Sequence, residues 1–174
     1  MHQWRVTKYD PRRRDREGHF PADDWTAVSD MGGKYNGQIL TVEKYLVVET
    51  AYVDAALRFF EESRCDALTV VGLEGDGRDS LADDPTGGIG LERGLTLREG
   101  QRVSGAVLGQ TIRLNLRSLV WCKLEEPGRF FLHFGHDYYM YVGSDSPSSA
   151  AIEFARQIGL FVEPKTSPHR ETPV

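Results

Sequence analysis

Hydrophobic residues recur along this chain with a helical period in some segments and a strand-like period in others. The clearest helical segment starts at Thr41, a residue suited to cap a helix N-terminus, and continues to about residue 60. Its apolar residues recur at spacings of three and four: Tyr45, Val48, Tyr52, Ala55, Ala56, Phe59 and Phe60. Charged residues, Glu49 among them, fill the opposite side, so we expect one face of this helix to pack on the core.

Short segments rich in β-branched and aromatic residues predict strands. In the N-terminal half these are His2–Tyr9, Trp25–Asp30 and Leu68–Leu73. In the C-terminal half they are Leu119–Glu125, Arg129–Phe134, Tyr138–Val142 and Leu160–Glu163. The turn sequences Glu126-Pro127-Gly128 and Gly135-His136-Asp137 join three of these into a predicted antiparallel meander.

Two further segments have helical features. Residues 101–117 fit a helix and a strand equally well, and we expect a helix that runs into a strand from about Leu116. Ser146 and Pro147 suit the N-cap and first positions of a helix that Gly159 would end. Together these elements predict one α+β domain over residues 1–174, with a mainly antiparallel sheet packed against about three helices. We expect a mobile surface loop at 74–90 and a polar tail from about residue 164.

Length and composition agree with a single globular domain. The chain has 174 residues, 40% hydrophobic and 27% charged, and this size allows a core without disulfides or metals. No run approaches the ~20 apolar residues of a membrane-spanning helix, and no secretory signal is visible. Cys65 and Cys122 belong to no metal-binding or redox motif. We therefore expect a cytoplasmic protein with no cofactor, no bound metal and no membrane contact.

Net charge narrows the class of partner. Lys and Arg number 21 against 26 Asp and Glu, which gives a formal net charge of −5 at pH 7. An acidic chain disfavours nucleic acid as a partner and suits a basic protein. The run Arg12, Arg13 and Arg14 could bind a phosphate or an acidic partner, although such runs are more often solvated loops.

The segment from His133 to Tyr141 combines two histidines, an aspartate and three tyrosines. If the hairpin turns at His136, residue 133 faces residue 139 and residue 131 faces residue 141. One face of the hairpin is then apolar and belongs to the core: Phe130, Leu132, Phe134, Tyr138, Met140 and Val142. The other face is aromatic with polar tips and suits a covering helix or a recognition surface: Phe131, His133, Tyr139 and Tyr141.

Three interpretations of these histidines are open. His133 and His136 could bind a metal if Gly135 bulged and Asp137 or Cys122 supplied a third ligand. His133 could act as a general acid or base with Asp137 or a tyrosine hydroxyl, although no nucleophile or oxyanion hole is evident beside it. The simplest interpretation is a core or turn histidine bonded to a backbone carbonyl.

Other chemically suggestive residues give weaker signals. The sequence Gly87–Gly90 is rich in glycine but lacks the remaining residues of a phosphate-binding loop. The acidic pair Asp83 and Asp84 has no apolar setting that would raise a carboxyl pKa, so we expect no catalytic role for it.

Three functions follow, each from a different class. The first is a protein-binding module, for example an immunity- or antitoxin-type protein of bacterial style, and it predicts an exposed patch of Phe131, Tyr139 and Tyr141. The second is a small enzyme that predicts a concave pocket around four candidate residues: His133, His136, Asp137 and Tyr139. The third is an RNA or nucleotide binder, which needs Arg or Lys beside exposed aromatic residues.

Overall fold

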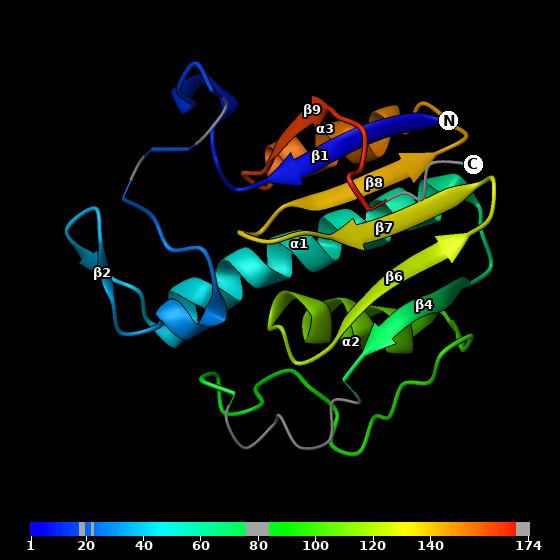
Figure 1. Cartoon of the computed structure of the whole chain (residues 1–174), viewed down its shortest axis with the longest axis horizontal. Coiled ribbons are helices and arrows are strands. Elements are labelled where there is room, and N and C mark those ends of the chain that lie inside the picture. Colours follow the sequence, from blue (N-terminus) through cyan, green and yellow to red (C-terminus); the bar gives the residue numbers. More distant parts are fainter. Residues whose placement is uncertain (18–19, 22, 76–83, 170–174) are drawn as a thin grey trace.

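One antiparallel sheet organises the part of the chain that the computed structural model describes, residues 1–17, 20–21, 23–75 and 84–169. Within these ranges seven strands pair in the order β5-β4-β6-β7-β8-β1-β9 (Figure 1). Their bounds are β1 His2–Thr7, β4 Leu68–Glu74, β5 Arg102–Val103, β6 Trp121–Glu126, β7 Phe130–Phe134, β8 Met140–Ser144 and β9 Phe161–Pro164. The short strands β2 (Lys34–Tyr35) and β3 (Gln38–Ile39) form a separate hairpin. The predicted α+β class is confirmed, and the sheet is larger than the predicted meander.

The helices lie together on one side of this sheet, behind it in Figure 1. They are α1 (Val42–Ser63), α2 (Gly105–Leu116) and α3 (Ser149–Gln157), with short 3-10 turns η1 (Pro11–Arg13) and η2 (Val28–Asp30) in the N-terminal segment. Alternate strand residues, such as Val6 of β1 and Leu132 of β7, are fully buried in the layer between the sheet and the helices. Within the described ranges, no helix combines the length and the apolar character needed to cross a bilayer.

The predicted strand Trp25–Asp30 does not form. Trp25 to Ala27 are in a loop that leads into η2. The Asp30 carboxylate accepts hydrogen bonds from the backbone N–H groups of Thr26 (2.7 Å) and Ala27 (3.0 Å). A side chain therefore satisfies the donors that a neighbouring strand would otherwise have bonded.

The boundaries of two helices differ from the prediction. Helix α2 continues through Leu116 and is followed by a turn, not a strand, so β6 begins only at Trp121. Helix α3 begins at Ser149 with Ser148 as its N-cap residue, two residues after the predicted N-cap, Ser146. The predicted end of α3 at Gly159 is confirmed, because Gly159 has a φ of 90° just after the last helical turn.

The β7–β8 hairpin also has a different register. His133 pairs with Tyr141 and Phe131 with Gly143, so each partner lies two residues further along than predicted. The turn is longer than expected because Gly135 to Tyr139 stand outside both strands. The assignment of residues to the two faces survives, since a shift of two residues preserves the alternation.

The part of β4 that extends beyond its short pairing with β5 has its outer edge occupied by a side chain. Strand β5 pairs with β4 only at Leu68 and Thr69. Further along β4, the Glu99 carboxylate accepts the backbone N–H groups of Gly72 (3.0 Å) and Leu73 (2.8 Å). These hydrogen bonds lower the pKa of the Glu99 carboxyl below 4.5, so it stays ionised while it occupies the edge.

Candidate functional site

A cleft of about 680 Å³ opens where β4 and β7 end and β6 and β8 begin. Among the described residues, five separate stretches of chain line it: Thr26 and Ala27, Glu74 and Gly75, Asn115 to Trp121 without Arg117, Phe134 to Tyr139, and His169. Thr26, Ser118, His136 and Asp137 are exposed at its rim. Both the size and the mixed aromatic and polar lining are typical of a binding site.

The turn between β7 and β8 forms one wall of this cleft and has an unusual backbone. Asp137 (φ 57°) and Tyr138 (φ 58°) both adopt the left-handed conformation, and the Tyr139 N–H closes the turn on the His136 carbonyl (3.2 Å). Aspartate tolerates this conformation, whereas a tyrosine in it costs on the order of 1–2 kcal/mol. Such strain persists only where surrounding contacts hold the residue in place.

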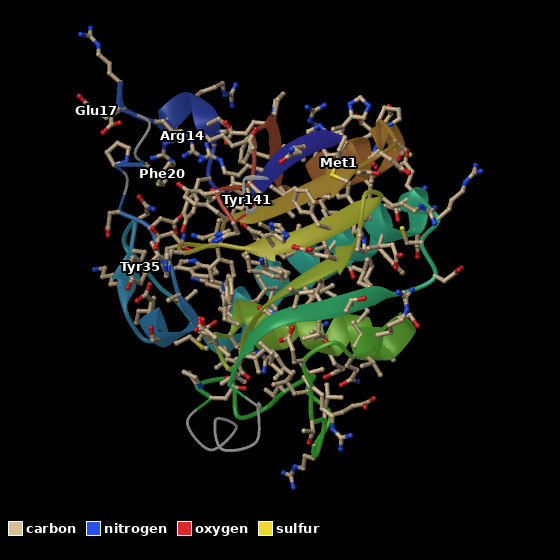
Figure 2. All side chains as sticks on the ribbon, turned by 45° about the vertical axis from the view of Figure 1, so that its right-hand side comes forward. Met1, Arg14, Glu17, Phe20, Tyr35 and Tyr141 are labelled. Atoms are coloured by element: carbon tan, nitrogen blue, oxygen red, sulfur yellow. The ribbon has the colours of Figure 1, made fainter. Side chains whose placement is uncertain are left out.

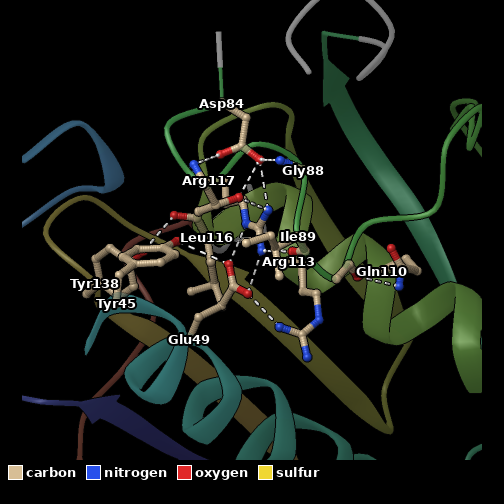
Figure 3. A network of polar contacts seen from close by, with 12 residues as sticks. Tyr45, Glu49, Asp84, Gly88, Ile89, Gln110, Arg113, Leu116, Arg117 and Tyr138 are labelled. Carbon is tan, nitrogen blue, oxygen red and sulfur yellow. Dashed lines mark hydrogen bonds and ion pairs between the residues drawn. The ribbon is translucent and has the colours of Figure 1, made fainter. Parts of the chain in front are cut away.

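Helix α1 supplies those contacts through one stripe of residues, Tyr45, Glu49 and Tyr52. The Tyr52 hydroxyl donates to the Tyr138 carbonyl (2.6 Å), and the Tyr138 hydroxyl donates to that of Tyr45 (2.6 Å). The Tyr45 hydroxyl in turn donates to Glu49 (3.2 Å) (Figure 3). The wall of the cleft is therefore fixed from the core at both the backbone and the side chain of Tyr138.

Glu49 belongs to a buried ion-pair network, not to the solvent-facing side of α1 as predicted. Its carboxylate makes two bonds to the Arg117 guanidinium, at 2.6 and 2.8 Å, and a further bond to Arg113. Arg117 also donates to Asp84 (2.8 Å) and to the Ile89 carbonyl (2.7 Å) (Figure 3). The side chains of Glu49, Arg117 and Asp84 are completely buried, so their charges are compensated within the protein.

Asp84 is likewise not the solvated loop residue expected from the sequence. Burial alone would raise the pKa of its carboxyl, but hydrogen bonds from Thr86 and Arg117 outweigh burial and hold the pKa below 3.8. Residues 76–83 of the predicted mobile loop lie outside the described residues. Beyond them, Arg117 ties Asp84, Thr86 and Ile89 to the helix layer.

The N-terminal wall of the cleft is held by a buried lysine. Lys8 Nζ lies 2.9 Å from the Asp24 carboxylate and 4.0 Å from the centre of the Trp25 ring. Burial lowers the pKa of this ammonium despite the nearby carboxylate. These contacts fasten the loop that carries Thr26 and Ala27.

The C-terminal segment, not a helix, covers the aromatic face of the sheet. Residues 165–169 cross the side opposite the helices, drawn in red in Figure 1. Phe131 is only 4% exposed and Tyr141 6%, so the predicted exposed aromatic patch is not present. The 170–174 part of the predicted polar tail lies outside the described residues.

His133 fastens this C-terminal segment. Its Nδ1 lies 2.8 Å from the Ser167 hydroxyl, and its Nε2 lies 2.8 Å from the Glu125 carboxylate. The same three residue types form hydrolytic triads, but the Ser167 hydroxyl also accepts the His169 N–H (3.2 Å), and Ser167 is only 4% exposed. We therefore assign the three side chains a structural role, which is to hold the C-terminal segment against the sheet.

His133 and His136 do not share a site. His133 is 1% exposed on the sheet face, whereas His136 lies in the turn at the cleft with Asp137 and Tyr139. Nor do the described residues contain any group of three or more His, Cys, Asp or Glu side chains that could hold a metal ion. Burial raises the pKa of the Cys122 thiol to about 11, so this cysteine is not a reactive thiolate at neutral pH.

The three consecutive arginines separate into different settings. Arg12 pairs on the surface with Asp10 (2.7 Å), and Arg13 lies over the Phe20 ring (5.5 Å). Arg14 is largely buried, donates to the Tyr139 hydroxyl (3.0 Å) and pairs with Glu163 (3.2 Å). Figure 2 shows Glu17 at the outer end of the N-terminal segment and Arg14 on the side of that segment nearer the sheet. These arginines form no single basic surface.

Comparisons with protein-family models, curated proteins and solved structures give no match for this chain.

Sequence reasoning missed most of the lining residues, among them Glu74, Trp121 and His169. Glu74 and Trp121 lie 47 positions apart in sequence and pair across β4 and β6. No local pattern reports such a pairing. His169 lies in a stretch that has no secondary-structure signal, and only the fold places it against Trp121 (ring centres 5.8 Å apart).

Proposed function

We propose that this protein is a binding module that takes a segment of a partner protein into the cleft at the end of its sheet. The observation that carries the proposal is the preformed cleft itself. Its rim is exposed, and the hydrogen bond from Tyr138 to Tyr45 holds the turn that forms one of its walls. A rigid, accessible site lowers the entropic cost of binding, because neither its backbone nor its walls need to be ordered by the partner.

An immunity- or antitoxin-type role is the concrete form of this proposal. The net charge of −5 supports it, because an acidic protein attracts a basic partner and accelerates their association. In that role a protruding part of the partner would enter the cleft, and this binding would neutralise the partner.

Filling the cleft tests the proposal. A tagged Thr26→Trp variant places a large ring at the rim, and a Thr50→Trp variant makes the same change at an exposed position of α1. Both variants and the wild type are checked for folding by circular dichroism and used to capture partners from a lysate of the native host, with mass spectrometry as the readout. We expect one stoichiometric partner with the wild type and with Thr50→Trp, and its loss with Thr26→Trp.

Two results would contradict the proposal. Equal capture by both variants would place the interaction elsewhere on the protein. Capture of no partner by the folded wild type would remove the protein-binding function itself and would direct attention to small-molecule ligands of the same cleft.

A further inference from the structure

The described lining of the cleft carries acidic side chains and two histidines, His136 and His169. Among its described lining residues are two carboxylates, Glu74 and Asp137, and no lysine or arginine. Neither carboxylate has a hydrogen bond or an ion pair to another side chain within the described part of the protein. A positively charged group that enters the cleft therefore meets two carboxylates, and none of the described lining residues is a lysine or an arginine that would compete for them.

Glu74 owes its position to an irregularity in β4. Val71 pairs with Lys123, and regular pairing would then put Leu73 opposite Trp121. An extra residue at Gly72, whose φ is 65°, shifts the register so that Glu74 lies opposite Trp121 instead. Residues directly opposite in an antiparallel pair have Cβ atoms about 4.5–5.5 Å apart, so the Glu74 and Trp121 side chains start from adjacent positions, and both line the cleft.

The Trp121 ring is held in a fixed place at the cleft. Its indole N–H donates to the Phe134 carbonyl (2.9 Å), which ties β6 to the end of β7. The His169 ring lies edge-on to it at 5.8 Å. Burial, with further contributions from His133, His136 and Lys123, lowers the pKa of His169 below 6.5, so this imidazole adds no positive charge at neutral pH.

The same pair of groups already holds a cation elsewhere in this protein. Lys8 Nζ lies 2.9 Å from the Asp24 carboxylate and 4.0 Å above the Trp25 ring. A carboxylate supplies charge and an indole face adds a cation–π attraction, and the two together suit a lysine or arginine side chain. In the cleft, Glu74 and Trp121 offer this combination to the outside.

We propose that the cleft recognises a lysine or arginine side chain of the partner, between the carboxylates of Glu74 and Asp137 and beside the indole of Trp121. This inference rests on the proposed function and specifies the chemistry of the segment that is bound. It requires that the recognised group be cationic, and that an uncharged group of the same shape be rejected.

A pair of matched probes tests the recognition of charge. N-acetyl-arginine-N-methylamide and its uncharged isostere, N-acetyl-citrulline-N-methylamide, are titrated into labelled protein and followed by ¹H–¹⁵N NMR. We expect the arginine probe to shift the Trp121 indole N–H and the amides of Glu74 and Asp137, and the citrulline probe to leave them unchanged. Equal shifts with both probes, or no shift with the arginine probe, would overturn the inference.

Variants identify the carboxylates. Glu74→Gln with Asp137→Asn should weaken binding of the arginine probe by about tenfold, the effect of removing two solvent-facing ion pairs. Asp54→Asn with Glu153→Gln removes the same two charges from exposed positions of α1 and α3 and should bind as the wild type does. Unchanged binding in the first double variant, or equal weakening in both, would contradict the assignment. If the arginine probe causes no shift while Thr26→Trp still abolishes capture of the partner, the proposed binding function is retained and only the proposed recognition of a cation is contradicted.

Discussion

Arg117 is the residue on which the buried polar groups converge. Its guanidinium is fully buried and bonds to Glu49, Asp84, Thr86 and the carbonyl of Ile89. Burial alone would lower the pKa of this group, but the two carboxylates outweigh burial and raise it, so the arginine stays charged. One side chain at the end of α2 thus links α1 to the described segment from Asp84 to Ile89.

Arg117→Met should lower the free energy of unfolding by about 3–5 kcal/mol, because it leaves buried carboxylates without their partner. Arg58→Met is the matched control, since Arg58 and Glu61 form an exposed pair at 3.2 Å that contributes at most about 1 kcal/mol. Urea denaturation of both variants measures the difference. A loss for Arg117→Met no larger than for Arg58→Met would show that the network contributes little to stability.

The sequence contained a signal for this network. Tyr45, Glu49 and Tyr52 follow one another at spacings of four and three, so Glu49 occupies the apolar stripe of its helix. Assigning Glu49 to solvent because it is charged gave the wrong face. A charged residue at a core position predicts a buried partner, although only the fold identifies that partner as Arg117.

At the level of elements, β4 shows how one strand serves two purposes. Its bulge at Gly72 carries Glu74 into the cleft, and its outer edge is occupied by the Glu99 carboxylate. Unpaired edge strands invite pairing with other chains, and a charged side chain on the edge suppresses it.

Glu99→Ala should increase self-association, because it frees the N–H groups of Gly72 and Leu73 for pairing with a second chain. Glu92→Ala is the control, since Glu92 is an exposed glutamate whose side chain has no such role. Sedimentation velocity over a range of protein concentrations gives the associated fraction. If both variants sediment as the wild type does, the Glu99 carboxylate is not required to prevent self-association through β4.

Elements could be predicted where a local period determines them. Helix α1 and the faces of β7 and β8 follow from the spacing of their apolar residues. The cleft could not be predicted, because its walls come from distant stretches of the chain and depend on the bulge at Gly72 and on left-handed backbone at Tyr138. Non-local pairing and tertiary contacts fix both features, and neither changes the hydrophobic pattern of the chain.

For the whole molecule, the two sides of the sheet are covered in different ways. Three helices bury one side, and residues 165–169 cover the aromatic part of the other within the described chain. The segment is held by side-chain bonds to Gln3 and His133 and by the ring of His169 against Tyr141. It is much smaller than a helix, so its removal uncovers the face without dismantling the core.

A chain that ends at Pro164 should bind more of a hydrophobic dye than a chain that ends at His169, because only the shorter chain lacks the His169 ring that packs against Tyr141. Fluorescence of the dye 8-anilinonaphthalene-1-sulfonate reports the exposure, and circular dichroism verifies that both chains are folded. Identical fluorescence would mean that residues 165–169 do not shield Tyr141.

The position of β1 also sets the order in which the molecule can be completed during synthesis. Its neighbours in the sheet are β8 and β9, whose residues 140–144 and 161–164 follow it along the chain only after a long intervening stretch. Residues 2–7 thus wait without a sheet partner until residues 140–144 have been translated, and closing this long loop is entropically slow. Strand β1 therefore joins the sheet later than β6 and β7, whose pairing requires only a short turn.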